Sequence, residues 1–262
     1  MDALFLKPFL TGLLLAPPAA VLGAYLRLRG EWLAAFAYAQ VAAAGGVVGA
    51  VLGLPVTAAA VTAALLAGGG KGLAARAGND LYALLILLAW GVALVVAANS
   101  PLGEIAGKAL FDGQIYFTGD AHLVMALALA ASCAALSPRL LRARFFPDHE
   151  RANGVAPWRH GLPFDLLVVC TVALATAAMG VMAAFALVFV PAWIAWRLAA
   201  GWRSALWLVA GIAVTAHVTA FVTALLFDQP YAPLLVLILW AMSMTRWFVR
   251  TRKDDRDGTD LG

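Results

Sequence analysis

Long apolar stretches separated by short polar segments run along almost the whole chain. A helix of about 20 apolar residues spans the hydrocarbon core of a bilayer, and nine stretches approach or reach that length. They are residues 3–26, 32–53, 55–70, 81–99, 121–138, 162–178, 180–198, 204–226 and 231–248. The pattern predicts an all-α polytopic integral membrane protein, a helical bundle with nine spans or, as the alternative, eight.

Basic residues fall almost entirely on one side of this predicted bundle. If the N-terminus is outside, only Lys7 and Lys108 of the 18 Lys and Arg residues lie outside, and the other 16 (18 minus 2) are cytoplasmic. Lys and Arg retained on the cytoplasmic side set the topology of membrane proteins. We therefore expect the N-terminus outside and the C-terminus in the cytoplasm.

The net charge of +4 has an explanation in the membrane. The basic residues flank predicted spans, where anionic lipid attracts them, so no nucleic-acid partner is expected. Cys133 and Cys170 lie within predicted spans and are interpreted as small core residues, not as a disulfide. The first span lacks a basic leader and a small-residue cleavage site, so it is interpreted as a retained helix and not a signal peptide.

No linker divides the chain into domains. Residues 1–250 are expected to form a single transmembrane domain, followed by a charged cytoplasmic tail at 251–262 that is expected to be disordered. The run from Gly68 to Gly72 contains Lys71 but lacks the spacing and the hydroxyl residue of a phosphate-binding loop. We therefore expect no cofactor on this chain and no enzymatic activity.

Three segments between the spans differ from plain connectors. The outer segment 101–120 carries four charged residues and is expected to lie at the membrane interface or to fold partly back into the bundle. The cytoplasmic segment 137–155 mixes charged and aromatic residues, which fits a short docking helix or a solvated basic loop. At 227–233, Pro230 favours a tight outer turn, where Asp228 is a carboxylate at the membrane mouth or a simple helix cap.

Four motifs occur in order along the chain. Leu110-Phe111-Asp112-Gly113 is followed by a cytoplasmic segment from Pro147-Asp148 to Gly154-Val155. Gly180 then precedes an apolar run that ends in Pro191-Ala192, and residues 228–233 read Asp-Gln-Pro-Tyr-Ala-Pro. From about residue 10 to about residue 246, the chain resembles the permease subunit of the zinc/manganese ABC importer family.

The resemblance implies a set of partners and roles. The permease would pair with a second permease chain, most simply as a homodimer, in the lipid bilayer of a bacterial inner (plasma) membrane. A cytoplasmic ATPase subunit would bind ATP and drive transport, and an extracytoplasmic metal-binding protein would deliver the cargo. Gly180, Pro191 and Pro230 would serve helix packing and gating. Residues expected to couple to the ATPase are Arg142, Arg144, Asp148, Glu150 and Gly154.

The chain departs from this family where a metal would be held. The family's second span carries an Asp and a His one helical turn apart, because zinc and manganese need nitrogen and oxygen ligands to replace lost water. Aligned with that segment, this chain has Phe36 in place of the Asp and Gln40 in place of the His. A further family His falls on Leu88. The ion therefore passes with fewer protein ligands, or the cargo differs.

His217 and Asp228 are the remaining candidates for metal contact. His217 is the ionisable side chain nearest the middle of a predicted span, and such groups are candidates for function. Asp228 follows 11 residues later, about 16 Å along a helix, so the two could be successive stations but could not share an ion. The alternative for His217 is a neutral imidazole hydrogen-bonded to a nearby Thr such as Thr215 or Thr219.

Other side chains of the predicted pathway have competing interpretations. The Gln40 amide oxygen suits a hard cation, but Gln more often forms interhelical hydrogen bonds. Phe36 and Tyr38 could close an aromatic gate. Four methionines could bind a copper-like ion, although flexible packing is their commoner role; they are Met179, Met182, Met242 and Met244.

Together these features predict the permease of an ABC importer for a divalent metal ion, zinc or manganese above all. One alternative is a permease of the same fold that carries a metal chelate or a small organic solute, since a complexed metal brings its own ligands. A second alternative is a membrane scaffold that does not transport.

Overall fold

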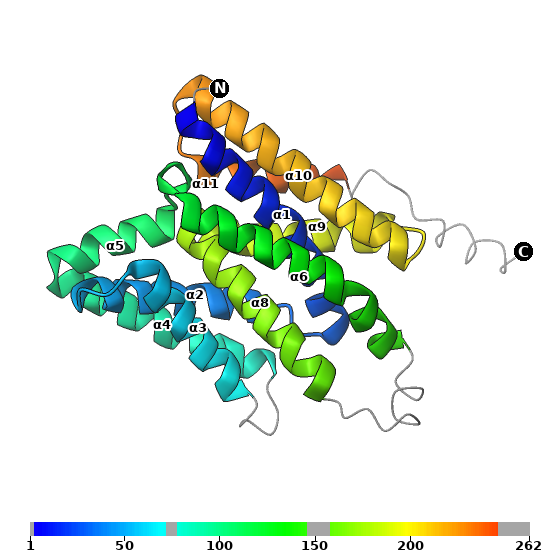
Figure 1. The fold of residues 1–262 in the computed structure, drawn as a ribbon, viewed down its shortest axis with the longest axis horizontal. Helices are drawn as coiled ribbons and strands as arrows, with labels where there is room; N and C mark the ends of the chain where they lie inside the picture. Colours follow the sequence, from blue (N-terminus) through cyan, green and yellow to red (C-terminus); the bar gives the residue numbers. More distant parts are fainter. Residues whose placement is uncertain (1–2, 72–77, 146–157, 246–262) are drawn as a thin grey trace, which may run out of the picture.

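The computed structural model describes residues 3–71, 78–145 and 158–245, and within them the chain forms helices and no strands. This confirms the predicted all-α class (Figure 1). The helices are α1 (Ala3–Arg29), α2 (Ala34–Val51), α3 (Val56–Lys71), α4 (Asn79–Asn99), α5 (Pro101–Asp112), the 3-10 turn η1 (Ile115–Phe117), α6 (Asp120–Phe145), α8 (Trp158–Met179), α9 (Val181–Leu198), α10 (Trp202–Phe227) and α11 (Tyr231–Ser243).

Each of the nine predicted stretches contains a helix, but the helices differ in length. Seven helices of the described chain are long and apolar enough to cross a membrane. The other two, α3 and α11, have 16 and 13 residues. At 1.5 Å per residue they span about 24 and about 20 Å, less than the hydrocarbon core of about 30 Å. The described parts of α3 and α11 are therefore shorter than a full membrane span.

Two helices, α1 and α2, organise the bundle, and both of them contact α8 and α9. Helix α1 packs against α6, α8, α9 and α10, whereas α2 packs against α3, α4, α5, α8 and α9. Figure 1 shows α1 lying between α6 and α10 and the α2 to α5 group beside them. In the 18-residue apolar stretches of α4 and α6, only 17% of the residues are buried inside the bundle. Their outer faces are therefore available to lipid or to another subunit.

Small residues bring these helices into close contact. In α2, a side chain at Gly45 would overlap Ala63 of α3, and one at Gly49 would overlap Ala59. In α1, a side chain at Gly23 would overlap the Val188 backbone carbonyl of α9. Lipid tails are as apolar as the helices, so dispersion between closely approaching backbones replaces the hydrophobic drive. The Ala- and Gly-rich composition of the first spans serves this packing.

The outer segment 101–120 folds back onto the bundle. Ser100 caps α5 by accepting a hydrogen bond from the Gly103 N–H at 3.3 Å, and α5 then packs against α2 and α4. Its buried face contains Gly103, Ala106, Gly107 and Leu110. Glu104 and Lys108 form an exposed ion pair at 2.7 Å on the opposite face. Of the two alternatives predicted for this segment, the folded-back one is observed.

Two glycines meet where this folded-back segment contacts the break between α8 and α9. Gly113 and Gly180 have φ angles of +82° and +89°, a region that L-residues with a side chain rarely adopt. A Cβ on Gly180 would lie 2.7 Å from the Gly113 nitrogen and 2.9 Å from the Phe111 carbonyl oxygen. A Cβ on Gly113 would overlap the Met179 carbonyl. Only glycine at both positions allows this contact between backbones.

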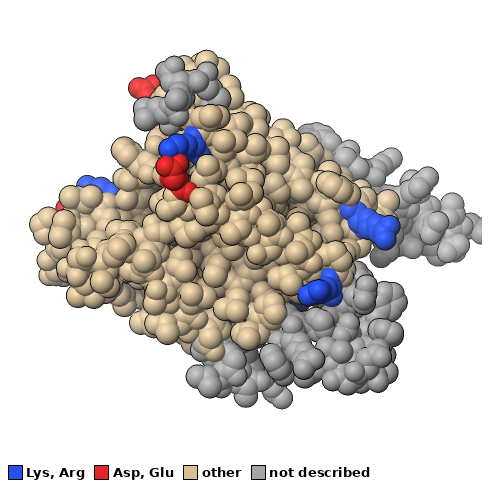
Figure 2. Space-filling model, viewed as in Figure 1, with Lys and Arg blue, Asp and Glu red and all other residues tan. Residues whose placement is uncertain are grey.

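Ion pairs and polar contacts lie at both ends of the bundle, which agrees with the predicted topology. At one end, Lys7 pairs with Asp120 at 2.7 Å. At the other, Arg29 pairs with Asp165 at 3.0 Å, and the Asn79 side chain donates to the Gly30 carbonyl at 3.1 Å. Figure 2 shows few charged side chains on one face, with a broad uncharged surface between them. The grouping supports the order of the loops, and the N-out orientation stays a prediction.

We predict that Gly180→Ala and Gly113→Ala each destabilise the protein by at least about 2 kcal/mol, because positive φ alone costs an L-residue about 1–2 kcal/mol and the added Cβ overlaps backbone atoms. For a chain of this size, the thermal midpoint should fall by roughly 5 °C or more. Fluorescence-detected size-exclusion chromatography of heated, detergent-solubilised protein measures this midpoint.

The matched control is Gly211→Ala in α10, where a Cβ would meet no atom within 4 Å. This substitution should leave the midpoint unchanged or raise it, because Ala favours helix over Gly. Equal midpoints for all three variants would show that the Gly113 and Gly180 contact does not hold the fold.

Candidate functional site

Phe36 and Gln40 lie one turn apart on α2, at the two positions where the family resemblance expects metal ligands. Phe36 is half-buried, and its ring centroid lies 4.9 Å from that of Phe185 in α9. Gln40 is 4% exposed. Its Oε1 is buried and accepts no hydrogen bond within the described chain.

The Gln40 oxygen is one of several buried polar atoms that have no partner in the described chain, the Thr171 and Thr176 hydroxyls among them. Buried polar side-chain atoms nearly always find a partner, and leaving one without costs about 1–3 kcal/mol. The interhelical hydrogen bond that was the alternative for Gln40 is therefore not made by this oxygen. The amide oxygen remains a free acceptor at a position that the resemblance assigns to the pathway.

Tyr38 lies on a different face of α2. It is buried, and its ring meets that of Tyr82 in α4 edge-on at 5.9 Å. Phe36 instead turns toward α9. In this conformation the two side chains contact different helices, so they do not form one aromatic gate together.

Phe36 belongs to a row of aromatic rings that sequence reasoning missed. Phe185 stacks on Phe189 at 5.4 Å, and Phe189 lies 5.6 Å from Trp32. The signal was present in the sequence, because Phe185 and Phe189 are four residues apart and share one face of a helix. An apolar groove of about 530 Å³ between α9 and α11 adjoins this row and includes Met182, Trp193 and Trp240 in its lining.

His217 is fully buried where α10 meets α1 and α11. Its Nε2 lies 3.1 Å from the Phe9 backbone carbonyl oxygen, which can only accept a hydrogen bond. Nε2 must therefore carry the proton, and Nδ1 accepts from the Tyr231 hydroxyl at 2.7 Å. The observed partners are these two groups and not Thr215 or Thr219. With both ring nitrogens hydrogen-bonded, the imidazole has no free lone pair for a metal in this conformation.

The space around the His217 ring is shaped for it. Phe9 stacks on the ring at 5.5 Å, and Tyr231 meets it edge-on at 5.6 Å. On α1, a side chain at Gly12 would overlap the imidazole. The ring thus fills a gap that the missing side chain of Gly12 leaves, and it ties α1, α10 and α11 together.

Asp228 ends α10 in the left-handed conformation, with φ 51° and ψ 46°. Its backbone N–H and that of Gln229 both point to the Ala224 carbonyl. Asp tolerates this conformation better than most residues, so the cap interpretation is observed. The carboxylate itself stays exposed. It lies close enough to Tyr116 to add to the effect of burial, and both raise the pKa of that phenol.

The two prolines predicted for gating lie in different settings. Pro191 is buried in the interior of α9, where its ring offers no N–H to the preceding turn. Pro230 has φ −65° and caps the start of α11 directly after the Asp228 turn. Both positions are places where a helix can bend or end, and their role in gating stays a prediction.

The described chain holds no group of three or more His, Cys, Asp or Glu side chains that could bind a metal. The residues predicted to couple to the ATPase are only partly visible: the backbone of Arg142 and Arg144 forms the last turn of α6. Asp148, Glu150 and Gly154 lie outside the described residues, as does most of the segment predicted as a docking helix or a basic loop.

We predict that Gly12→Ala and His217→Ala each destabilise the protein, His217→Ala by about 2–4 kcal/mol through a cavity and lost hydrogen bonds. The double variant should lose less than the two single losses added together, because the methyl group added at position 12 enters space that the imidazole has left. Thermal midpoints of the four proteins in the cycle measure the coupling.

The control is Thr219→Ala on the exposed side of α10, which should leave the midpoint unchanged. Strictly additive losses in the double variant would refute the matched packing of Gly12 and His217. A larger effect for Thr219→Ala than for His217→Ala would restore the threonine interpretation.

Comparison with known proteins places this geometry in a family. The model of the ABC 3 transport family matches residues 1–250. No curated protein matches the chain significantly. Among solved structures, PsaBC from Streptococcus pneumoniae in complex with Fab is similar over 95% of this chain and 92% of that chain, with a TM-score of 0.76 and 19% identity.

A second solved structure, described as a putative metal-chelate type ABC transporter in an inward-facing conformation, has a TM-score of 0.61 and 16% identity. The similarity covers 93% of this chain and 85% of that chain. At these identities both structures support the fold alone, but the family model covers nearly the entire chain, and the resemblance seen in the motifs is confirmed. The chain belongs to the ABC 3 transport family of ABC transporter permeases.

Proposed function

We propose that this chain is the membrane-spanning permease of an ABC importer that takes up a divalent metal ion, with zinc and manganese as the main candidates. The family match over residues 1–250 carries the proposal. Seven long apolar helices supply the membrane domain. The sequence has no phosphate-binding loop, so ATP binds to a partner ATPase.

The partners follow from this role. Segment 139–154, which is cytoplasmic in the predicted topology, would contact the ATPase. The end of the bundle where Asp228 is exposed would receive cargo from an extracytoplasmic binding protein. A second permease chain would complete the transporter. The exposed aromatic face of α9 and α11, with Met182 and Trp240 each more than half exposed, suits contact with that second chain or with the cargo.

One observation favours a second candidate cargo, a metal chelate. Where the family has an Asp and His pair, this chain has Phe36 beside Phe185 and an amide at Gln40. A bare divalent ion needs oxygen or nitrogen ligands to leave water, whereas a chelated ion already has them. An organic chelator also presents apolar surface, which aromatic side chains bind well.

An uptake assay with the reconstituted transporter distinguishes the two candidate cargoes. We predict ATP-dependent uptake of zinc or manganese by proteoliposomes that contain this permease, its ATPase and its binding protein. The transported element is measured by mass spectrometry, with the metal given free or pre-bound to a chelator. Faster uptake of the free ion supports the first candidate, and uptake only of the complex supports the second.

The controls use an ATPase that cannot hydrolyse ATP and the variant Asp228→Asn. Asn also tolerates the left-handed conformation, so this variant keeps the helix end but removes the charge. If Asp228 receives cations, uptake should fall several-fold at low metal concentration and recover at high concentration. Absence of uptake for every element and complex tested would refute the proposed function.

A variant at Gln40 tests whether its free amide oxygen contacts the cargo. We predict that Gln40→Met keeps or raises the thermal midpoint, because an unsatisfied buried acceptor is removed. Uptake should nevertheless fall about tenfold, the loss expected from one ligand contact worth about 1.4 kcal/mol.

The matched control is Thr171→Val in α8. It likewise removes a buried polar group, here a hydroxyl that has no partner in the described chain. It should leave uptake unchanged. Normal uptake by Gln40→Met would show that the amide is not part of the pathway.

A further inference from the structure

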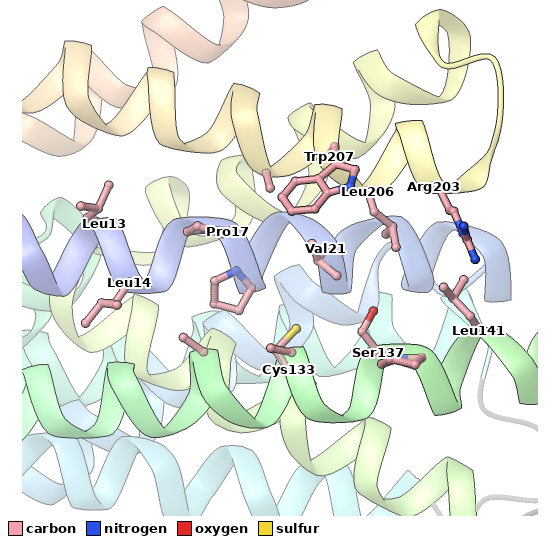
Figure 3. Close-up of a pocket in the computed structure, with 15 residues that line it drawn as sticks. Leu13, Leu14, Pro17, Val21, Cys133, Ser137, Leu141, Arg203, Leu206 and Trp207 are labelled. Atoms are coloured by element: carbon pink, nitrogen blue, oxygen red, sulfur yellow. The ribbon is translucent and has the colours of Figure 1, made fainter.

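A second apolar groove lies on the far side of α1 from the aromatic row, between α1, α6 and α10. Its volume is about 600 Å³. Figure 3 shows its walls, with α1 in the middle and α6 and α10 on either side. Aliphatic side chains dominate the lining, among them Leu14, Pro17, Val21 and Leu206.

The groove has the length of one membrane leaflet. Along α6 it extends from Ala130 to Leu141, about 16 Å at 1.5 Å per residue, and along α10 from Arg203 to Ala210. Half of a hydrocarbon core of about 30 Å is about 15 Å. Because α10 begins at Trp202 and α6 ends at Phe145, the groove runs from the middle of the bundle to its basic end. In the predicted orientation this is the cytoplasmic leaflet.

Polar groups of the groove are concentrated at that end. Ser137 is already satisfied, because its Oγ lies 2.8 Å from the Tyr25 hydroxyl. Arg203 is the charged residue of the lining. It is exposed and forms no ion pair within the described chain. Figure 3 places it at the end of the groove near Leu141, with Trp207 along the rim. Trp207 is 82% exposed, and Trp is enriched where membrane meets water.

We propose that this groove binds one anionic phospholipid of the cytoplasmic leaflet, with an acyl chain along α1, α6 and α10 and the phosphate paired with Arg203. An apolar groove within the hydrocarbon core is not filled by water. A guanidinium that has no ion pair in the described chain and lies at the headgroup level attracts anionic lipid. The aliphatic lining matches an acyl chain, and the single cation at one end matches an anionic headgroup.

Native mass spectrometry of the full-length chain tests this site. The purified protein is titrated with dioleoyl phosphatidylglycerol or dioleoyl phosphatidylcholine, and the bound lipids are counted. We expect one phosphatidylglycerol to bind in preference to phosphatidylcholine. Arg203→Gln should weaken phosphatidylglycerol binding about tenfold, as loss of one charge-assisted contact does, with little effect on phosphatidylcholine. Ala134→Phe, which fills the groove, should weaken both.

The matched control is Arg197→Gln, which removes an exposed basic residue from the same end of the bundle but outside the groove. It should keep the lipid preference of the unmodified protein. Equal losses for Arg197→Gln and Arg203→Gln would overturn the proposal, because general charge would then explain the preference. Unchanged lipid binding by Ala134→Phe together with loss of dimer would assign the groove to a second copy of the chain and also overturn it.

Discussion

Close approach of helix backbones is the constraint on which this bundle depends. Inside a bilayer, burying an apolar side chain gains nothing over leaving it in lipid, so helices hold together through dispersion at short range. Gly23 against the Val188 carbonyl and Gly45 against Ala63 are such contacts. The contact between Gly113 and Gly180 applies the same principle to non-helical backbone. Such backbone can lie within the membrane only where protein covers it. These contacts fix where α5 and the α8 to α9 break lie.

The two buried polar side chains of the candidate site show opposite solutions to the same problem. His217 has both nitrogens hydrogen-bonded, by Phe9 and Tyr231, and is enclosed by rings and by Gly12. Gln40 keeps an acceptor without a partner in the described chain. A buried polar group with its hydrogen bonds stabilises one packing arrangement, whereas a buried polar group without them lowers the stability of the fold. We therefore propose Gln40, rather than His217, as the residue that contacts the cargo.

The two apolar grooves described above differ in position and in chemistry. The groove by α9 and α11 adjoins a row of aromatic rings that includes Phe36. The groove by α6 and α10 is mainly aliphatic and ends at Arg203. Aromatic surface next to the expected ligand positions fits a cargo path, and an aliphatic slot with one cation at the headgroup level fits a lipid. The proposed cargo path and the proposed lipid site would thus occupy separate surfaces of the chain.

The sequence by itself determined the helical class, the apolar segments, the grouping of the charges and the family, because hydropathy, charge and short motifs are local properties. It also identified Gly180 and Asp228 as special positions. Only the tertiary structure decided that Phe9 and Tyr231 bind His217 and that α5 folds back. It also decided that Phe36 and Tyr38 face different helices and that the Gln40 oxygen has no partner among the described residues. These outcomes depend on which helices meet, and residues such as Phe9 and His217, 208 positions apart, become neighbours only through packing.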